Sequence, residues 1–310
     1  MKSLKTFIII TFIAYCGSSV AQQLPYLSQL GEAKTYWNPA MTAVNTSSHL
    51  DLFLRQQWVG FGGAPSTGFI NYDYPFLKSN MGMGGSLLYD KTGPLNKIGI
   101  QINYAYKLID ALGEDSQLSL GISAGGQNYS INTTNAIINQ IEDPLLANAS
   151  RSGFFPSVGA GIYYISDTRG YRSDNSFYLG LAYQQAYQSN LLISAWNQKR
   201  FRHFVLDFGT RLYGDGGYFE PSFTVNYVNP ELLNLQLSTK YEMKDRFWAG
   251  IGYSTINDLI IQGGVIFNEI AGRDTKLRLG LLANAGISSN SLTDFGPGFE
   301  FFMRYELDLD

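Results

Sequence analysis

The chain has 310 residues, a formal net charge of −3, 33 glycines and a single cysteine, and 15% of its residues are aromatic. Its acidic balance excludes a protein that binds nucleic acid through a basic stripe, because such binding neutralises phosphates with lysine and arginine. One cysteine excludes a disulfide framework within the chain and a metal site built from several thiolates.

Residues 1–21 have the pattern of a secretory signal peptide. Two lysines precede an apolar run over residues 7–14, and small residues lead to Ala21. This order predicts export and cleavage after Ala21, which leaves a mature chain without cysteine. A lipoprotein signal around Cys16 is the alternative, but bulky Tyr15 stands where lipid-attachment sites usually carry a small residue.

The next segment, residues 22–48, is too polar and irregular for a strand. We expect a periplasmic N-terminal extension there. Residues 49–310 form the remaining predicted unit, a single domain, because no linker or break in composition divides them.

From His49 onward, apolar residues alternate with polar or small ones in short segments separated by turn residues. Side chains of a strand point alternately to two faces, so each segment has one apolar and one polar face. In an outer-membrane barrel the apolar face meets lipid and the polar face lines the lumen. The clearest segments predict six residues that face lipid: Leu233, Leu235, Leu237, Phe299, Phe301 and Met303.

The turn signals predict fourteen strands, and an even number suits a bacterial single-chain barrel. Twelve or sixteen strands remain alternatives. We expect the strands near residues 50–58, 66–75, 81–90, 98–108, 116–130, 155–166, 176–185, 200–213, 218–228, 233–242, 246–254, 258–267, 276–286 and 297–307.

Two longer connections interrupt this pattern. They cover residues 132–155, with room for a short helix, and residues 187–199. After the signal peptide no run of eighteen apolar residues exists, which excludes a transmembrane helix. An exported, β-patterned chain without cysteine therefore predicts an all-β fold, a transmembrane antiparallel β-barrel embedded in the lipid of the bacterial outer membrane.

Residues that suggest chemistry do not form a convincing site. His49 and His203 are the only histidines and give no metal-ligand spacing. His203 and Asp207 share a strand face, but a separation of roughly 13 Å is too long for a catalytic hydrogen bond. Strand glycines such as Gly82 to Gly85 precede no helix, so we expect them to relieve crowding in a closed sheet. We therefore predict no enzyme, no metal and no cofactor.

Three motifs in the first third of the chain go beyond a generic barrel. They are N-P-A at residues 38–40, R-Q-Q-W-V-G-F-G-G-A-P at residues 55–65 and D-K-T-G-P at residues 90–94. In this order and spacing the chain resembles the PorP/SprF family of outer-membrane proteins found in Bacteroidetes. The acidic tail after Tyr305 departs from the aromatic end of a general barrel.

This resemblance implies accessory work in type IX secretion and gliding motility. Family members look like barrels that assist delivery or attachment of large cell-surface adhesins and that dock periplasmic components of the secretion machinery. The alternative is a transport channel for small or hydrophobic solutes, with residues 22–48 available as a plug. The lumen discriminates between them, since an open path favours transport and a side-chain-filled barrel favours a scaffold.

The segment over residues 55–67 has two interpretations. Its glycines permit positive φ and Pro65 stops pairing, which suits a periplasmic turn with aromatic anchors at the membrane interface. The segment is also longer and more aromatic than a turn needs, which suits a docking surface for a periplasmic partner. The predicted docking residues are Arg55, Gln57, Trp58, Phe61, Pro65, Asp90, Gly93 and Pro94.

Overall fold

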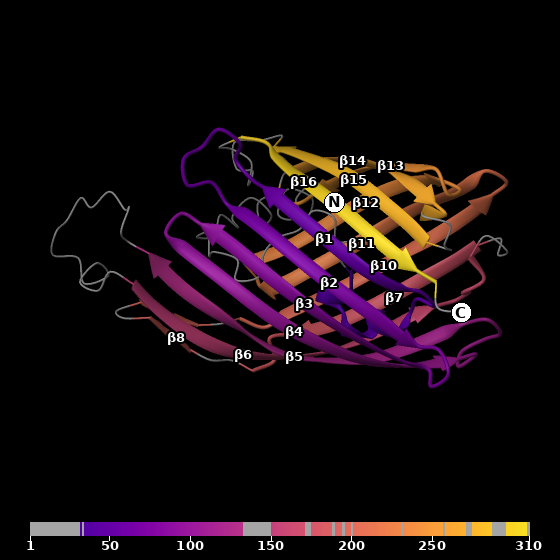
Figure 1. The fold of residues 1–310 in the computed structure, drawn as a ribbon, viewed down its shortest axis with the longest axis horizontal. Coiled ribbons are helices and arrows are strands. Elements are labelled where there is room, and N and C mark those ends of the chain that lie inside the picture. The colour runs from indigo at the N-terminus through magenta and orange to yellow at the C-terminus, as the bar shows by residue number, and fades with distance from the viewer. Residues whose placement is uncertain are drawn as a thin grey trace, which may run out of the picture.

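The computed structural model describes Glu32 and residues 34–132, 150–170, 175–187, 190–193, 196–199, 201–230, 232–256, 258–270, 275–286 and 296–308. Within them, fourteen antiparallel strands close into a barrel (Figure 1). The predicted fold class and strand count are confirmed. No helix in this part of the chain is long and apolar enough to cross a membrane. The signal peptide and the predicted short helix within residues 132–155 lie outside the described residues.

The strands follow one another around the barrel in chain order. The wall consists of β1 (Ser48–Gln56), β2 (Ser66–Phe76), β3 (Met81–Thr92), β4 (Leu95–Ile109), β5 (Gln117–Asn132), β6 (Ser150–Ile165), β7 (Asn175–Gln184), β10 (His203–Gly214), β11 (Gly217–Asn229), β12 (Leu232–Met243), β13 (Phe247–Ser254), β14 (Asp258–Asn268), β15 (Thr275–Gly286) and β16 (Gly298–Leu307). The connection from β7 to β10 contains a separate hairpin that the sequence analysis did not predict, formed by β8 (Asn190–Ile193) and β9 (Trp196–Lys199).

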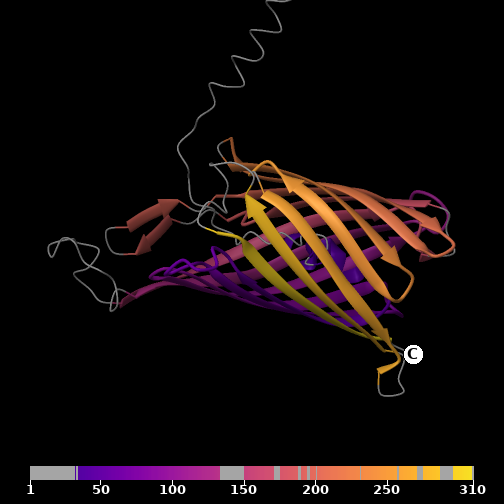
Figure 2. The ribbon, with the colours of Figure 1, turned by 90° about the horizontal axis from the view of Figure 1, so that it is seen from above.

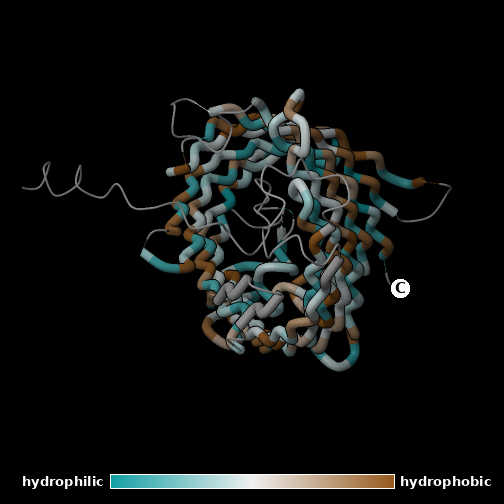
Figure 3. The backbone as a smooth tube through the Cα atoms, turned by 90° about the vertical axis from the view of Figure 1, so that its left-hand side faces the viewer, coloured by the Kyte–Doolittle hydropathy of each residue, from teal (hydrophilic) through white to brown (hydrophobic). Residues whose placement is uncertain are grey.

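Hydropathy alternates along the strands (Figure 3). Because successive side chains of a strand point to opposite faces, this alternation separates a lipid face from a lumenal face. On β12, the side chain of Leu237 is 59% exposed on the outer face, whereas that of its neighbour Gln236 is 4% exposed in the lumen. Phe299 on β16 is exposed outside, and Glu300 is buried inside. The predicted face assignment is therefore confirmed at both segments.

The first and last strands close the barrel. β1 pairs antiparallel with β16 (Figure 1), and in their register Phe53 lies opposite Phe302. The centroids of these two buried rings are 4.8 Å apart. Together with Phe69 on β2 they begin an aromatic core inside the lumen rather than outside it.

The two ends of the barrel differ in their connections. One end, here the long-loop end, carries residues 57–65, the β8–β9 connection and the connection from β15 to β16. The other, the short-turn end, carries tight turns such as residues 244–246, together with the start of β1 and the end of β16. Figure 2 shows the β8–β9 hairpin projecting at the end opposite the C-terminus.

Candidate functional site

The segment before β1 lies inside the barrel. It contains α2 (Lys34–Trp37) and η1 (Pro39–Ala43), and Tyr36 and Trp37 pack into the lumenal aromatic core. We call Glu32 and residues 34–45 the plug. A periplasmic extension was expected for residues 22–48, but their described part packs in the lumen because its aromatic residues bury against lumenal side chains.

Wall amides hold the backbone of the plug. In this four-residue helix the Lys34 carbonyl accepts from Asn38 N at 2.8 Å, and the three later carbonyls need donors from outside the helix. Amide groups on the lumenal faces of β4 and β7 supply them: Gln101 donates to Tyr36 O at 3.2 Å, Asn103 to Thr35 O at 3.0 Å and Gln184 to Trp37 O at 3.0 Å. The plug is thus hydrogen-bonded to two strands of the barrel wall, β4 and β7.

Asn38, the first residue of the N-P-A motif, caps η1 and also binds the backbone of two strands of the wall. Its Oδ1 accepts from the backbone nitrogen of Ala40 at 3.0 Å and caps η1. Its Nδ2 donates to the backbone oxygens of Ile162 at 3.0 Å and Leu181 at 3.4 Å. Pro39 suits the first helical position, where no backbone donor is needed. The motif therefore fastens the plug to β6 and β7.

Wall glycines make room for η1. A Cβ on Gly121 would overlap the backbone nitrogen of Ala40, and one on Gly161 would overlap the side chain of Asn38. A Cβ on Gly82 would meet the backbone oxygen of Thr42. These glycines relieve crowding, as expected from the sequence, and the plug is what requires the space.

Charged side chains fix the first described residue of the plug. The Glu32 carboxylate lies 3.1 Å from Lys240 Nζ, 3.8 Å from an Arg304 nitrogen and 3.9 Å from an Arg278 nitrogen. Burial alone would raise the pKa of this carboxyl, but the three cations outweigh it and hold the pKa well below its ordinary value. The cluster borders a cavity of about 280 Å³ toward the short-turn end.

Side chains of the plug and of the wall pack together across the middle of the lumen in the described part of the chain. Two cavities flank the plug, one lined by Tyr36 and Gln184 and the other by Trp37 and Asp207, with volumes of about 10 and 20 Å³. A buried water needs roughly 10–15 Å³, so each has room for about one molecule. In the described part of the chain, these flanking spaces do not amount to an aqueous channel.

The sequence did not single out Glu32, Lys34, Tyr36 or Trp37 as functional, although the N-P-A motif and the strand glycines were signals of a packed segment. Lys34 Nζ lies 3.0 Å from Asp207. Asp207 therefore belongs to the contacts of the plug.

The predicted docking residues lie at the long-loop end, and the structure brings their two segments together. Gly93 N donates to Gly63 O at 3.0 Å, which joins the β3–β4 turn to the β1–β2 loop. Phe61 is 50% exposed, and its ring centroid lies 6.1 Å from that of Trp58 in an edge-on arrangement. Trp58 has a φ of 48°, a conformation that is costly for a residue with a side chain.

The eight residues divide into a surface and its support. Gln57, Trp58, Phe61, Gly93 and Pro94 are exposed or half-buried. Arg55 is buried beside Glu300 at 3.3 Å, and Pro65 is buried. Asp90 accepts a hydrogen bond from Thr67 at 2.7 Å and pairs with Lys97 at 3.2 Å. We call Gln57, Trp58, Phe61, Gly93 and Pro94 the loop surface.

Comparison with known proteins gives a family and a fold. The chain matches the family model described as "Type IX secretion system membrane protein PorP/SprF" over residues 19–305. Similar solved structures include the "CymD monoaromatic hydrocarbon channel", with a TM-score of 0.54 and 11% identity over 92% of this chain and 95% of that chain. A Pseudomonas aeruginosa FadL homologue has a TM-score of 0.49 and 11% identity over 88% and 93%. No curated protein matches the chain. At these identities the structural likeness shows the barrel fold alone.

Proposed function

Because the chain belongs to the PorP/SprF family of type IX secretion system membrane proteins, we propose that it is a plugged scaffold that helps deliver or attach large cell-surface adhesins. It is an outer-membrane barrel of that secretion system, and its family and fold indicate a non-enzymatic role.

The filled lumen is the observation that carries the proposal. A solute channel needs a path through the barrel, but here wall amides bind the carbonyls of α2 and three cations surround Glu32. Two spaces beside α2 hold about one water each, and the larger cavity of about 280 Å³ borders the plug toward the short-turn end. This arrangement favours a barrel that works through its two ends.

The loop surface is the part that we assign to the secreted adhesin. Outer-membrane barrels place short turns in the periplasm and longer loops outside, so the long-loop end faces the cell exterior. With this orientation we propose a partner on the cell surface for the loop surface, whereas the sequence suggested a periplasmic partner. Aromatic residues at a surface often dominate binding energies, and the loop surface has two of them, the exposed Phe61 and the half-buried Trp58.

Periplasmic components of the secretion machinery would meet the short-turn end. A polar cavity of about 510 Å³ opens there, lined by turn residues and by the end of β16. Its lining carries four carboxylates and one lysine: Asp245, Glu269, Glu306, Asp308 and Lys276. We infer that this acidic rim favours a basic periplasmic partner.

The test is a double substitution, Trp58→Ala with Phe61→Ala, in cells that display a type IX adhesin. We expect adhesin on the cell surface to fall severalfold while the amount of folded barrel in the outer membrane is unchanged. Tyr187→Ala is the matched control, because Tyr187 is another exposed aromatic residue at the long-loop end. It should leave display unchanged.

Other outcomes would count against this role. Normal display in the double variant would remove the loop surface from the proposal. A loss of display that only follows a loss of folded barrel would assign Trp58 and Phe61 to structural anchoring. Defective solute uptake with normal display would favour the transport channel.

A further inference from the structure

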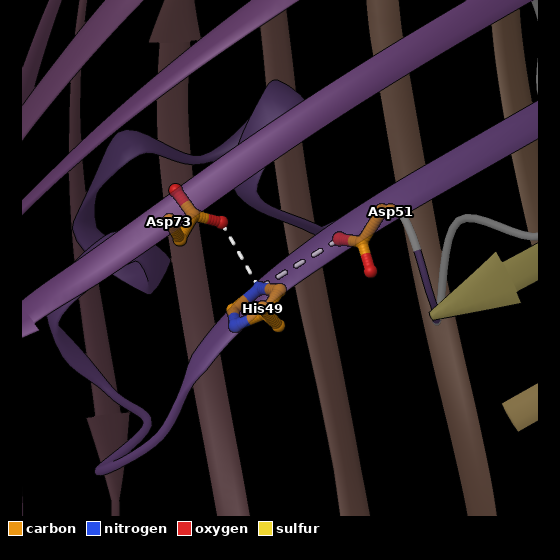
Figure 4. Close-up of side chains that lie close together, drawn as sticks. All are labelled: His49, Asp51 and Asp73. Atoms are coloured by element: carbon orange, nitrogen blue, oxygen red, sulfur yellow. Dashed lines mark ion pairs between the residues drawn. The ribbon is translucent and has the colours of Figure 1, made fainter. Parts of the chain in front are cut away.

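One histidine and two aspartates converge inside the wall near the start of β1 (Figure 4). His49 on β1 lies opposite Asp73 on β2 in the strand register, and Asp51 follows His49 on the same face. His49 Nε2 is 3.0 Å from Asp73 Oδ2 and 3.7 Å from Asp51 Oδ2. The three donor atoms lie within 4.8 Å of one another.

This cluster is buried and its polar atoms are incompletely satisfied. His49 is 2% exposed, and Asp51 and Asp73 are 0% exposed. His49 Nε2 makes no hydrogen bond, although two carboxylate oxygens lie close to it, and Asp73 Oδ1 has no hydrogen-bond partner. Buried polar atoms usually have partners, so the unpartnered Asp73 Oδ1, next to an imidazole nitrogen held only by ion pairs, points to a group that the protein itself does not supply.

Neighbouring side chains hold the two carboxylates in place. Asn71 Nδ2 donates to Asp73 Oδ2 at 2.6 Å. Arg304 Nε donates to Asp51 Oδ1 at 2.6 Å, and a second nitrogen of Arg304 donates to Asp51 Oδ2 at 3.1 Å. Such outer contacts orient ligands in metal sites. Two carboxylates and one arginine leave one negative charge beside the His49 imidazole.

We propose that His49, Asp51 and Asp73 bind a divalent transition-metal ion with the preferences of zinc. Zinc accepts imidazole nitrogen and carboxylate oxygen at about 2.0–2.2 Å, which separates the ligand atoms of a tetrahedron by about 3.4 Å. The separations of 3.0 and 3.7 Å from His49 Nε2 bracket that value. Calcium and magnesium favour oxygen ligands alone, so the imidazole disfavours them.

The location gives the ion a structural role. Thr42 of the plug packs beside Gly84 of β3, where Asp73 Oδ1 also lies, so the cluster lies at the contact between plug and wall. Because His49 is the second residue of β1, the ion joins β1 to β2 where the plug leads into the barrel. An ion that binds the folded barrel and not the unfolded chain would stabilise the barrel.

The experiment is a calorimetric titration of the full-length folded barrel in detergent, with any affinity tag removed and metals stripped by a chelator. We expect one equivalent of Zn²⁺ to bind to the wild type. His49→Gln and Asp73→Asn should weaken binding at least tenfold. His203→Gln is the matched control, since His203 is the other histidine of the chain, and it should bind Zn²⁺ like the wild type.

A second measurement needs no variant. X-ray absorption at the zinc edge of the wild-type barrel should show only nitrogen and oxygen ligands, with a single imidazole. No saturable binding by the wild type would overturn the proposal, as would equal binding by folded His49→Gln. A zinc shell with two imidazoles or none would also overturn it.

Discussion

Glu32 of the plug and Lys240 of β12 form an ion pair in which carboxylate and ammonium lie 3.1 Å apart, although 208 residues separate them in the chain. The same carboxylate faces Arg278 and Arg304. A single side chain therefore connects the N-terminal segment to three strands of the opposite wall.

Replacing Glu32 with glutamine should loosen the plug. Removing one partner of a buried ion pair leaves the other charge uncompensated, at a cost of about 3–5 kcal/mol when no water reaches it. The adjoining cavity lowers that cost, so we expect amide exchange of residues 34–37 to accelerate at least tenfold. Hydrogen exchange with mass spectrometry measures this. Glu114→Gln is the control, because Glu114 lies exposed in a turn at the short-turn end, and it should change nothing.

The fastening at Glu32 should withstand mild acid. The pKa of Glu32 lies well below the ordinary value of about 4.3. The ionised carboxylate therefore stabilises the plug fully above that pH, and this stabilisation is lost as the pH falls toward the lowered pKa. Between pH 7 and pH 5.5, plug protection should stay constant once intrinsic exchange rates are corrected. A loss of protection across this range would show that another titrating group holds the plug.

Gly121→Ala should displace the plug and spare the wall. The added methyl would overlap the backbone nitrogen of Ala40, which cannot rotate away. We expect residues 34–43 to become at least tenfold more accessible to exchange, while the folded barrel keeps its heat-modifiable gel mobility. Gly85→Ala is the control, since a Cβ there has its nearest neighbour at 3.9 Å. Equal protection in both variants would contradict tight packing of η1.

Two substitutions at Trp58 distinguish the effect of backbone strain on stability from the effect of the aromatic ring on adhesin display. Its φ of 48° is disfavoured by a Cβ but not by glycine. Trp58→Gly should therefore be more stable than Trp58→Ala by about 1 kcal/mol, measured by denaturant titration of the folded barrel. Both variants lack the ring, so both should lose adhesin display. Better display by the glycine variant would tie display to loop stability instead of the aromatic contact.

Leu237 tests the lipid face. It is 59% exposed near the middle of β12, and an arginine at the bilayer midplane costs roughly 2–4 kcal/mol. Leu237→Arg should lower unfolding stability in lipid by that amount, and Leu237→Phe should lie within about 1 kcal/mol of the wild type. Similar losses in both variants would mean that packing, not lipid exposure, governs this position.

The strands were predictable because each one separates lipid from lumen. The two faces produce a two-residue period of apolar residues at Leu233, Leu235 and Leu237. This period can be recognised in the sequence without knowing which strands pair. The fourteen predicted strands match those of the wall, with end points that differ by a few residues. The hairpin of β8 and β9 was missed because its two short strands pair only with each other.

The plug and the histidine cluster depend on pairings that the sequence does not reveal. Space for η1 comes from Gly82, Gly121 and Gly161, which lie on three different strands. Likewise, His49 meets Asp73 only through the register of β1 with β2. A search for two histidines at a fixed spacing could not detect a cluster made from one histidine and a carboxylate of the neighbouring strand.

The pairing of β1 with β16 also governs the order of assembly. The plug directly precedes β1, and β1 completes the sheet only by joining the last strand of the chain. Contacts between such distant segments form late in folding, because the intervening chain must be ordered first. We therefore expect the N-terminal segment to be enclosed when β1 joins β16 and the sheet closes. A chain that ended before β16 would leave this segment in an open sheet with an unpaired edge.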